Sequence, residues 1–111
     1  MPEATPRVFQ LETTVESPEE ARKIASTLVE KRLAACVQIA GPISSTFRWE
    51  GRVQEAEEHL LLCKVPAQRL RAATSLIEEL HGYDVPEILA FEVAKGSRSY
   101  LKWVAAEATG E

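Results

Sequence analysis

The segment Ser45-Thr46-Phe47-Arg48-Trp49-Glu50-Gly51-Arg52 places the pair Glu50-Gly51 between two stretches that favour β structure. A glycine at such a position is typical of the tip of a β-hairpin, because glycine tolerates the backbone angles that a tight turn requires. We therefore predict two antiparallel strands that meet at this turn, one over residues 35–49 and one over residues 52–65.

The predicted hairpin is long for a chain of 111 residues. Gly41-Pro42 interrupts the first strand, and we expect a bulge or bend there, because proline has no N–H to donate to a neighbouring strand. The far half of the return strand, residues 52–58, is polar. An arm longer than the core that it covers needs another surface to rest on, so we interpret the hairpin as an oligomerisation element.

A helix is predicted on each side of the hairpin. Ser17-Pro18-Glu19-Glu20 is a strong helix start, with a capping serine, a proline at the first helical position and a glutamate three residues after the cap. Apolar residues then recur at helical spacing, and this helix is expected to end near Arg32 or Leu33. Pro66 is expected to open the second helix, and Gly82 is placed to stop it.

The outermost predicted elements are two strands and a last helix. The first strand is expected over residues 7–15. The strand over residues 87–95 is almost continuously apolar, which predicts burial on both of its faces. Ser97 is expected to cap the last helix.

This order of elements, βαββαβ with an extra C-terminal helix, predicts an α+β fold of the ferredoxin-like type. Right-handed crossovers would place both long helices on one face of a four-stranded antiparallel sheet. The other face would then need cover, and association with further copies is the simplest source of it. We assign residues 7–108 to one domain and residues 1–6 to a flexible N-terminal tail.

Composition narrows the classes of function. The net charge of −4 disfavours a nucleic-acid or anionic-membrane partner. No apolar run approaches the ~20 residues that span a bilayer, and residues 1–7 lack the features of a signal peptide, so a cytoplasmic location is expected. No nucleophile elbow or paired-carboxylate motif is present, and we predict that the protein is not an enzyme.

Three segments together resemble the CutA divalent-cation tolerance family. They are Glu30-Lys31-Arg32-Leu33-Ala34-Ala35-Cys36-Val37, Trp49-Glu50-Gly51 and His81-Gly82-Tyr83-Asp84-Val85-Pro86-Glu87. The resemblance implies a ferredoxin-like homotrimer with a part in tolerance to divalent cations, above all copper. It also implies copper or another divalent cation as the bound species.

The resemblance makes Cys36 and His81 the candidate metal ligands. Cys63 and Glu87 are weaker candidates, which rest on their thiol and carboxylate groups and not on the resemblance. Thiolate suits Cu(I), and imidazole suits Cu(II). None of these residues stands at a diagnostic local spacing, so a site would have to be assembled in space. Two buried, reduced thiols and a histidine at a helix C-terminus are the structural alternatives.

A small-molecule sensor is the alternative function. The CutA fold is similar to that of the trimeric PII signalling proteins, which bind nucleotides in clefts between subunits, and this similarity concerns the fold alone. An anionic ligand could be held by aromatic residues with polar groups and by a lysine. These candidates are Trp49, Tyr83, Tyr100, Trp103 and Lys64. The same aromatic residues could instead fill the core and the subunit contacts.

Overall fold

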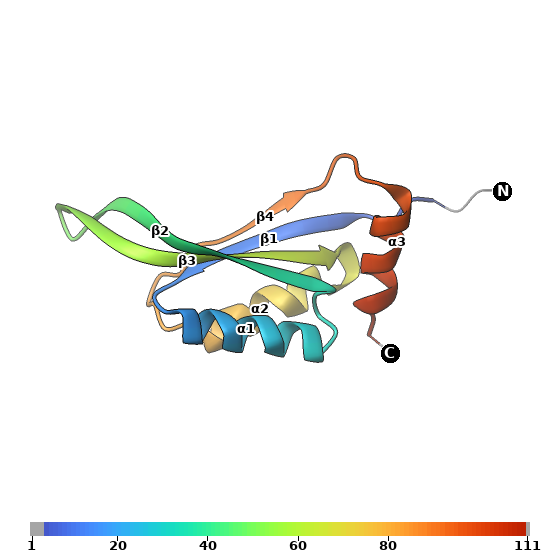
Figure 1. The fold of residues 1–111 in the computed structure, drawn as a ribbon, viewed down its shortest axis with the longest axis horizontal. Helices are drawn as coiled ribbons and strands as arrows, with labels where there is room; N and C mark the ends of the chain where they lie inside the picture. The colour runs from blue at the N-terminus through green and yellow to red at the C-terminus, as the bar shows by residue number, and fades with distance from the viewer. Residues whose placement is uncertain (1–3, 111) are drawn as a thin grey trace.

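Four strands form one antiparallel sheet in the order β2-β3-β1-β4. The computed structural model describes residues 4–110 and is drawn in Figure 1. The strands are β1 (Val8–Val15), β2 (Cys36–Trp49), β3 (Arg52–Pro66) and β4 (Ile88–Glu92). The predicted α+β, ferredoxin-like order of elements is confirmed.

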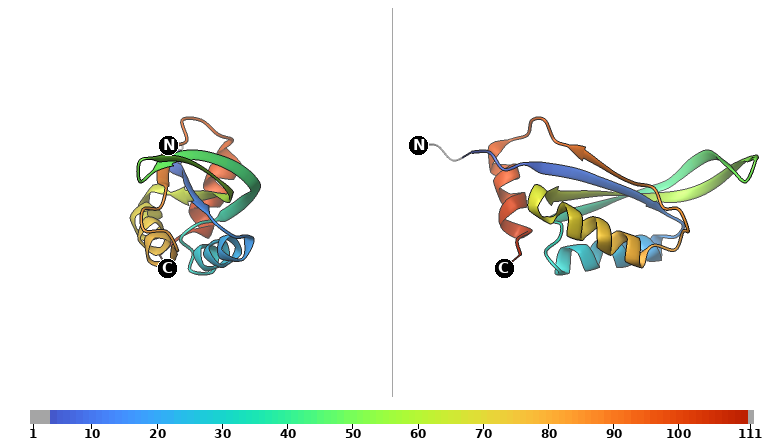
Figure 2. Two further views of the ribbon diagram at one scale, coloured as in Figure 1. Left: turned by 90° about the vertical axis from the view of Figure 1, so that its left-hand side faces the viewer. Right: turned by 180° about the vertical axis from the view of Figure 1, so that it is seen from behind.

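The two long helices, α1 (Pro18–Glu30) and α2 (Leu70–Leu80), lie side by side on one face of the sheet (Figures 1 and 2). The third helix, α3 (Arg98–Glu107), packs across the end of the sheet opposite the hairpin tip. None of the helices in residues 4–110 has the length and apolar character needed to cross a membrane. Of the predicted tail, residues 4–6 form no helix or strand, and residues 1–3 lie outside the described part.

Helix α1 begins as predicted and ends earlier than predicted. Ser17 Oγ accepts a hydrogen bond of 3.1 Å from the Glu20 N–H. The helix ends at Glu30 rather than near Arg32 or Leu33, because Arg32 adopts a left-handed backbone conformation with φ of 58°. The Arg32 guanidinium donates to the carbonyl oxygens of residues 106 and 107 at the end of α3. This residue therefore joins the ends of two helices.

Both predicted boundaries of the second helix are corrected. Pro66 ends β3, and a 3-10 turn η1 (Ala67–Arg69) precedes α2. Gly82 is not the residue that stops α2, because His81 already has an extended backbone, with φ of −72° and ψ of 140°. The Gly82 N–H instead donates to the Glu20 carboxylate at 2.9 Å, which ties the end of α2 to the start of α1.

The hairpin has the predicted turn and the predicted irregularity. Trp49 pairs with Arg52, and the two turn residues have positive φ angles, 52° at Glu50 and 79° at Gly51. The register between β2 and β3 shifts between Ala40 and Ile43, where the bulge was expected. The arm projects beyond the helices and gives the molecule dimensions of 56 × 25 × 21 Å (Figure 2).

The main core lies between the sheet and the helices α1 and α2. It contains Leu11, Val15, Ala21, Ile24, Leu28, Leu33, Ala34, Leu61, Cys63, Val65, Ala73 and Ile77. A smaller cluster of Val8, Leu101 and Val104 attaches α3 to the sheet.

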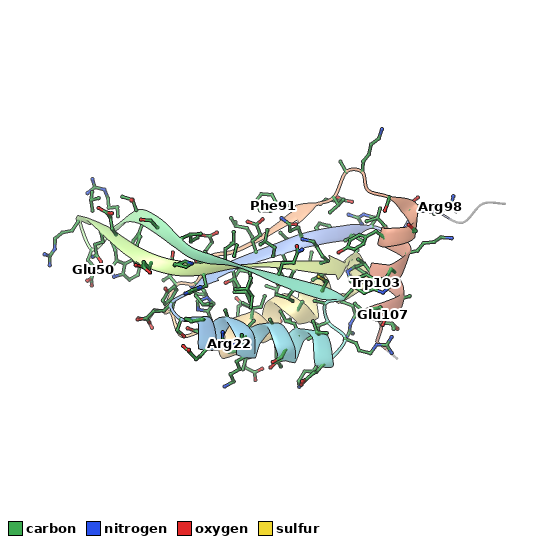
Figure 3. All side chains as sticks on the ribbon, viewed as in Figure 1. Arg22, Glu50, Phe91, Arg98, Trp103 and Glu107 are labelled. Atoms are coloured by element: carbon green, nitrogen blue, oxygen red, sulfur yellow. The ribbon has the colours of Figure 1, made fainter. Side chains whose placement is uncertain are left out.

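The sequence predicted that the last strand is buried on both of its faces, and this prediction is wrong. It is shorter than residues 87–95 and forms one edge of the sheet. Leu89 and Phe91 are 48% and 52% exposed, and Figure 3 shows Phe91 on the side away from α1 and α2. The reason is that both long helices cover the opposite face, so the apolar residues of this face have no cover within one chain.

The burial of α1 predicts a difference between two aliphatic truncations. Ile24 is fully buried, whereas Val29 on the same helix is 42% exposed. We expect Ile24→Ala to lower the free energy of unfolding by about 2–5 kcal/mol, because it leaves a cavity in the core. The matched control Val29→Ala should change it by about 1 kcal/mol or less. Chemical denaturation at one protein concentration measures both, and equal losses would contradict the assigned packing.

Candidate functional site

The predicted site residues lie in two groups at opposite ends of the molecule. Cys36, Lys64, Tyr100 and Trp103 lie at the α3 end, where β2 begins and β3 finishes. Trp49, His81, Tyr83 and Glu87 belong to the hairpin and to the segment after α2. In Figure 3, Trp103 on α3 and Glu50, the neighbour of Trp49, mark these two ends.

At the α3 end, Cys36 pairs with Lys64 across the strands. Cys36 is half-buried and is not in a disulfide. The Lys64 ammonium donates to Gln10 Oε1 at 2.7 Å and to Gln38 Oε1 at 3.1 Å. Because side chains alternate along a strand and Cys63 faces the core, Cys36 and Lys64 face the side that the long helices leave uncovered.

Two aromatic rings of α3 lie beside this position. The ring centroids of Tyr100 and Trp103 are 5.6 Å apart, and both side chains are partly exposed. Burial raises the pKa of Tyr100, and its contact with Cys36 raises it further. Tyr100 therefore remains a neutral phenol next to the Cys36 thiol.

Cys63 is separated from Cys36 by the sheet itself. It pairs with Val37, the residue after Cys36, and its side chain is fully buried among the core residues. Burial raises the pKa of the Cys63 thiol to about 12. The placement favours the alternative of a small apolar core residue, because an inaccessible, protonated thiol is a poor metal ligand.

Both ring nitrogens of His81 already have partners within the chain. Nδ1 accepts a hydrogen bond of 3.1 Å from the Tyr83 N–H, so Nδ1 carries no proton. Nε2 lies 2.9 Å from the carbonyl oxygen of Thr14, which can only accept, so the proton is assigned to Nε2. In this arrangement His81 fixes the segment after α2 and offers no free lone pair to a metal ion.

Tyr83 continues this network to the hairpin. Its hydroxyl donates to Glu58 Oε2 at 2.9 Å, and Glu58 is only 8% exposed. Burial raises the pKa of Tyr83, and the adjacent Glu58 carboxylate raises it further. Glu58 is not among the site residues predicted from the sequence. A glutamate between the apolar and polar halves of β3 was the only local signal.

Within residues 4–110, no three His, Cys, Asp or Glu side chains come close enough together to hold a metal ion. Cys36 pairs with Lys64 of β3, and Lys64 pairs with Gln10 of β1, so Cys36 lies level with Gln10. His81 instead contacts Thr14, which is four residues farther along β1. Four residues along a strand span about 13 Å, so one chain does not bring these two predicted ligands together. A site that contains both needs residues from more than one copy.

An open groove of about 1000 Å³ runs between the hairpin arm and the segment after α2. Phe47 and Trp49 of the arm line it, as does Tyr83 opposite them. The acidic residues of the lining are Glu16, Glu57, Glu58, Asp84 and Glu87. Of the groove residues, Trp49, Tyr83 and Glu87 are among the site residues predicted from the sequence.

Comparison with known sequences gives a consistent result. The model of the family described as CutA1 divalent ion tolerance protein matches residues 10–107. The chain is 47% identical to the divalent-cation tolerance protein CutA of Thermus thermophilus over 82% of this chain and 88% of that protein. It is 41% identical to the chloroplastic protein CutA of Arabidopsis thaliana, over 82% of this chain and 50% of that protein. The chain therefore spans about half the length of the plant relative.

Solved structures agree with the fold. The structure of divalent cation tolerance protein Cut A1 from Thermus thermophilus superposes with a TM-score of 0.89 at 42% identity, covering 92% of this chain and 99% of that chain. The crystal structure of CutA1 from Oryza sativa gives a TM-score of 0.92 at 34% identity, over 96% of this chain and 98% of that chain.

The different surroundings of the two cysteines predict different thiol reactivity. We expect Cys36 to react with a thiol-specific reagent in the native protein, and Cys63 to react only after unfolding, because Cys63 is buried and protonated. Mass spectrometry of the modified protein identifies the reacting residue. Cys36→Ala should remove the native-state reaction, and fast modification of Cys63 in the folded protein would contradict its placement.

The contact between Tyr83 and Glu58 predicts a stability change with a defined pH dependence. Tyr83→Phe removes the donor from a buried carboxylate and should lower the free energy of unfolding by about 1–3 kcal/mol at neutral pH. Because the pKa of Tyr83 is raised in the folded state, its contribution is fully present below pH about 10 and declines above it. The parent should therefore lose stability above pH 10 more steeply than the variant. Parallel slopes in denaturant titrations across this range would contradict the assignment.

Proposed function

We propose that this chain, which belongs to the CutA1 divalent ion tolerance protein family, contributes to divalent-cation tolerance by binding copper or a related cation as a homotrimer. The observation that carries the proposal is the position of Cys36. It is a free, half-buried thiol on the sheet face that no long helix covers. Thiolate is a preferred ligand of Cu(I), so this residue is the first candidate among those predicted.

The proposed site lies between copies rather than inside one chain. The described residues of a single chain hold no cluster of three ligands, and Cys36 is far along the sheet from His81. A partner copy would therefore complete the coordination of a cation at Cys36. His81 could join only if it gave up its hydrogen bond with Tyr83 or Thr14, which makes it a weaker ligand than the sequence implied. Glu87 is exposed beside the groove and has no such restriction.

Two features support assembly into a homotrimer. Leu89 and Phe91 present large apolar side chains on the uncovered sheet face. The hairpin arm extends beyond its own helices and carries the further exposed residues Phe47, Trp49 and Val53. Apolar surface of this extent is typical of a face that another subunit covers. The proposed number of copies, three, comes from the resemblance of the sequence to its family.

The second candidate function is a sensor for a small anionic ligand in clefts between subunits, and the groove beside the arm is the open space considered for that ligand. The five residues proposed to contact the anionic ligand lie at two separate places in this structure. Trp49 and Tyr83 line the groove, whereas Lys64 lies at the other end with Tyr100 and Trp103. The groove is rich in carboxylates, which repel an anion. The charge of the groove therefore favours the cation-binding proposal over the anion sensor. In that proposal the protein acts by binding and not by catalysis. We also propose a cytoplasmic location.

A copper titration of the reduced protein tests the metal proposal. The protein competes with a chelator of known affinity, and light scattering gives the mass of the assembly in the same samples. We expect a fixed ratio of copper to trimer. Cys36→Ala should weaken binding by at least about tenfold, because a thiolate ligand is lost. His81→Ala should have a smaller effect.

Matched control variants distinguish a specific copper site from adventitious copper binding. Cys63→Ala removes the buried thiol. His59→Ala removes the imidazole of the second histidine, which lies on β3 opposite Val15 of β1. Neither variant should change the affinity for copper. Copper bound in no fixed ratio, or with equal affinity by the Cys36→Ala variant, would exclude the proposed site. A monomeric mass at micromolar concentration would exclude the proposed assembly.

A further inference from the structure

The sheet face that α1 and α2 leave uncovered carries both apolar and charged side chains. Strand pairing places Glu12 of β1 between Leu62 of β3 and Leu89 of β4. Two residues away along each strand, Lys64 of β3 lies level with Phe91 of β4. Because side chains alternate along a strand, these five residues face the same side, on which Figure 3 shows Phe91. A glutamate and a lysine therefore lie on a surface that is otherwise rich in apolar groups.

The two charges are connected within one chain, but not to each other. The Lys64 ammonium donates to Gln10 Oε1 at 2.7 Å and to Gln38 Oε1 at 3.1 Å. The Gln10 amide donates in turn to Glu12 Oε2 at 2.8 Å. In residues 4–110, neither Lys64 nor Glu12 forms a direct ion pair. A neutral amide therefore separates an ammonium and a carboxylate, and neither neutralises the other directly.

Both charged groups have hydrogen-bonding capacity left. The described contacts of Lys64 use two of its three N–H donors, and those of Glu12 use one of its two carboxylate oxygens. Both side chains are half-buried, so they are already partly shielded from water by their neighbours on the sheet. A further partner for each can come only from the open side of this face.

Cover by another molecule would remove the remaining water from this face. An ammonium or carboxylate that is buried without an opposite charge destabilises a complex, so a purely apolar partner surface fits poorly here. A second copy of the chain has the same leucine and phenylalanine side chains, and it also supplies one lysine and one glutamate. The face is therefore complementary to itself in charge as well as in apolar character, which identifies a second copy as the molecule that covers it.

We infer that Lys64 of one copy pairs with Glu12 of a neighbouring copy across the uncovered sheet faces. The inference rests on the homotrimer of the proposed function, and not on copper binding. Apolar contact would supply most of the buried area, whereas the charge pair would fix the orientation, because other orientations bring like charges together. In a closed ring each copy contributes both partners, so the contact is repeated once for every copy.

Charge reversal tests the pair. The variants Glu12→Lys and Lys64→Glu are purified separately without copper, and light scattering over a series of protein concentrations measures their assembly. We expect each variant to need at least about tenfold more protein than the parent to assemble, because like charges meet between copies.

Mixing the two variants in equal amounts should at least partly restore assembly. The introduced lysine of one variant then meets the introduced glutamate of the other, and in a ring of three such contacts can form at two of the three interfaces. Within each variant chain the two charges remain alike, so a contact confined to one chain gives no restoration on mixing. The mixture therefore distinguishes a pair between copies from a pair inside one copy.

The matched controls are Glu78→Lys and Arg71→Glu, which reverse the same charges on the exposed side of α2. Both should assemble like the parent. Circular dichroism establishes that each variant is folded. If a reversal prevents folding, the neutral variants Glu12→Gln and Lys64→Gln replace it. Their double variant should then weaken assembly less than the two single effects combined, because the second change removes a partner already lost.

Three results would overturn the inference while the parent remains a trimer. They are charge variants that assemble at the parent's concentration, control variants that are weakened equally, and a mixture of the two reversals that shows no restoration. A monomeric parent would instead refute the proposed assembly itself. The two failures are therefore distinguishable, and neither depends on the copper titration at Cys36.

Discussion

The packing of α1 and α2 against the same face of the sheet is the constraint on which the rest of the structure depends. It gives the protein its main core, between the helices and the inward side chains of β1 and β3. It also leaves the other face with exposed leucine and phenylalanine side chains at the β4 edge. The hydrophobic contribution to folding is thus complete on one side only, which is the physical basis for expecting assembly.

Because side chains alternate along β2 and β3, the two cysteines lie on opposite faces of the sheet. Helices cover only one of these faces, so the two thiols differ in their chemistry. Cys63 faces the helices and remains a buried thiol, whereas Cys36, on the adjacent strand, faces the uncovered side. Sequence patterns alone left both residues as possible ligands or possible core residues. Register decides between these roles, because a shift of one residue would exchange the two faces.

The segment after α2 shows how a sequence motif can have a role different from the one its residue types suggest. His81 and Tyr83 were selected as a metal ligand and a ligand contact. In the folded chain, His81 binds Thr14 and Tyr83, and Tyr83 binds Glu58, so the motif connects α2, β1 and the hairpin. The same contacts shape one wall of the acidic groove. Glu58 and Glu16 join the lining of the groove from distant parts of the chain, and the only local signal was the place of Glu58 between the apolar and polar halves of β3.

Local signals by themselves determined most of the elements: the Ser17 cap, the Glu50-Gly51 turn, the irregularity at Gly41-Pro42 and the βαββαβ order. They succeeded because caps, turns and periodicity depend on neighbouring residues. The end of α1, the end of α2 and the exposure of β4 were decided by tertiary structure. Arg32 reaches α3, Glu20 binds Gly82, and β4 lies at an edge without a helix above it. Such outcomes depend on contacts between residues far apart in the chain, and the sequence specifies these contacts only through the completed fold.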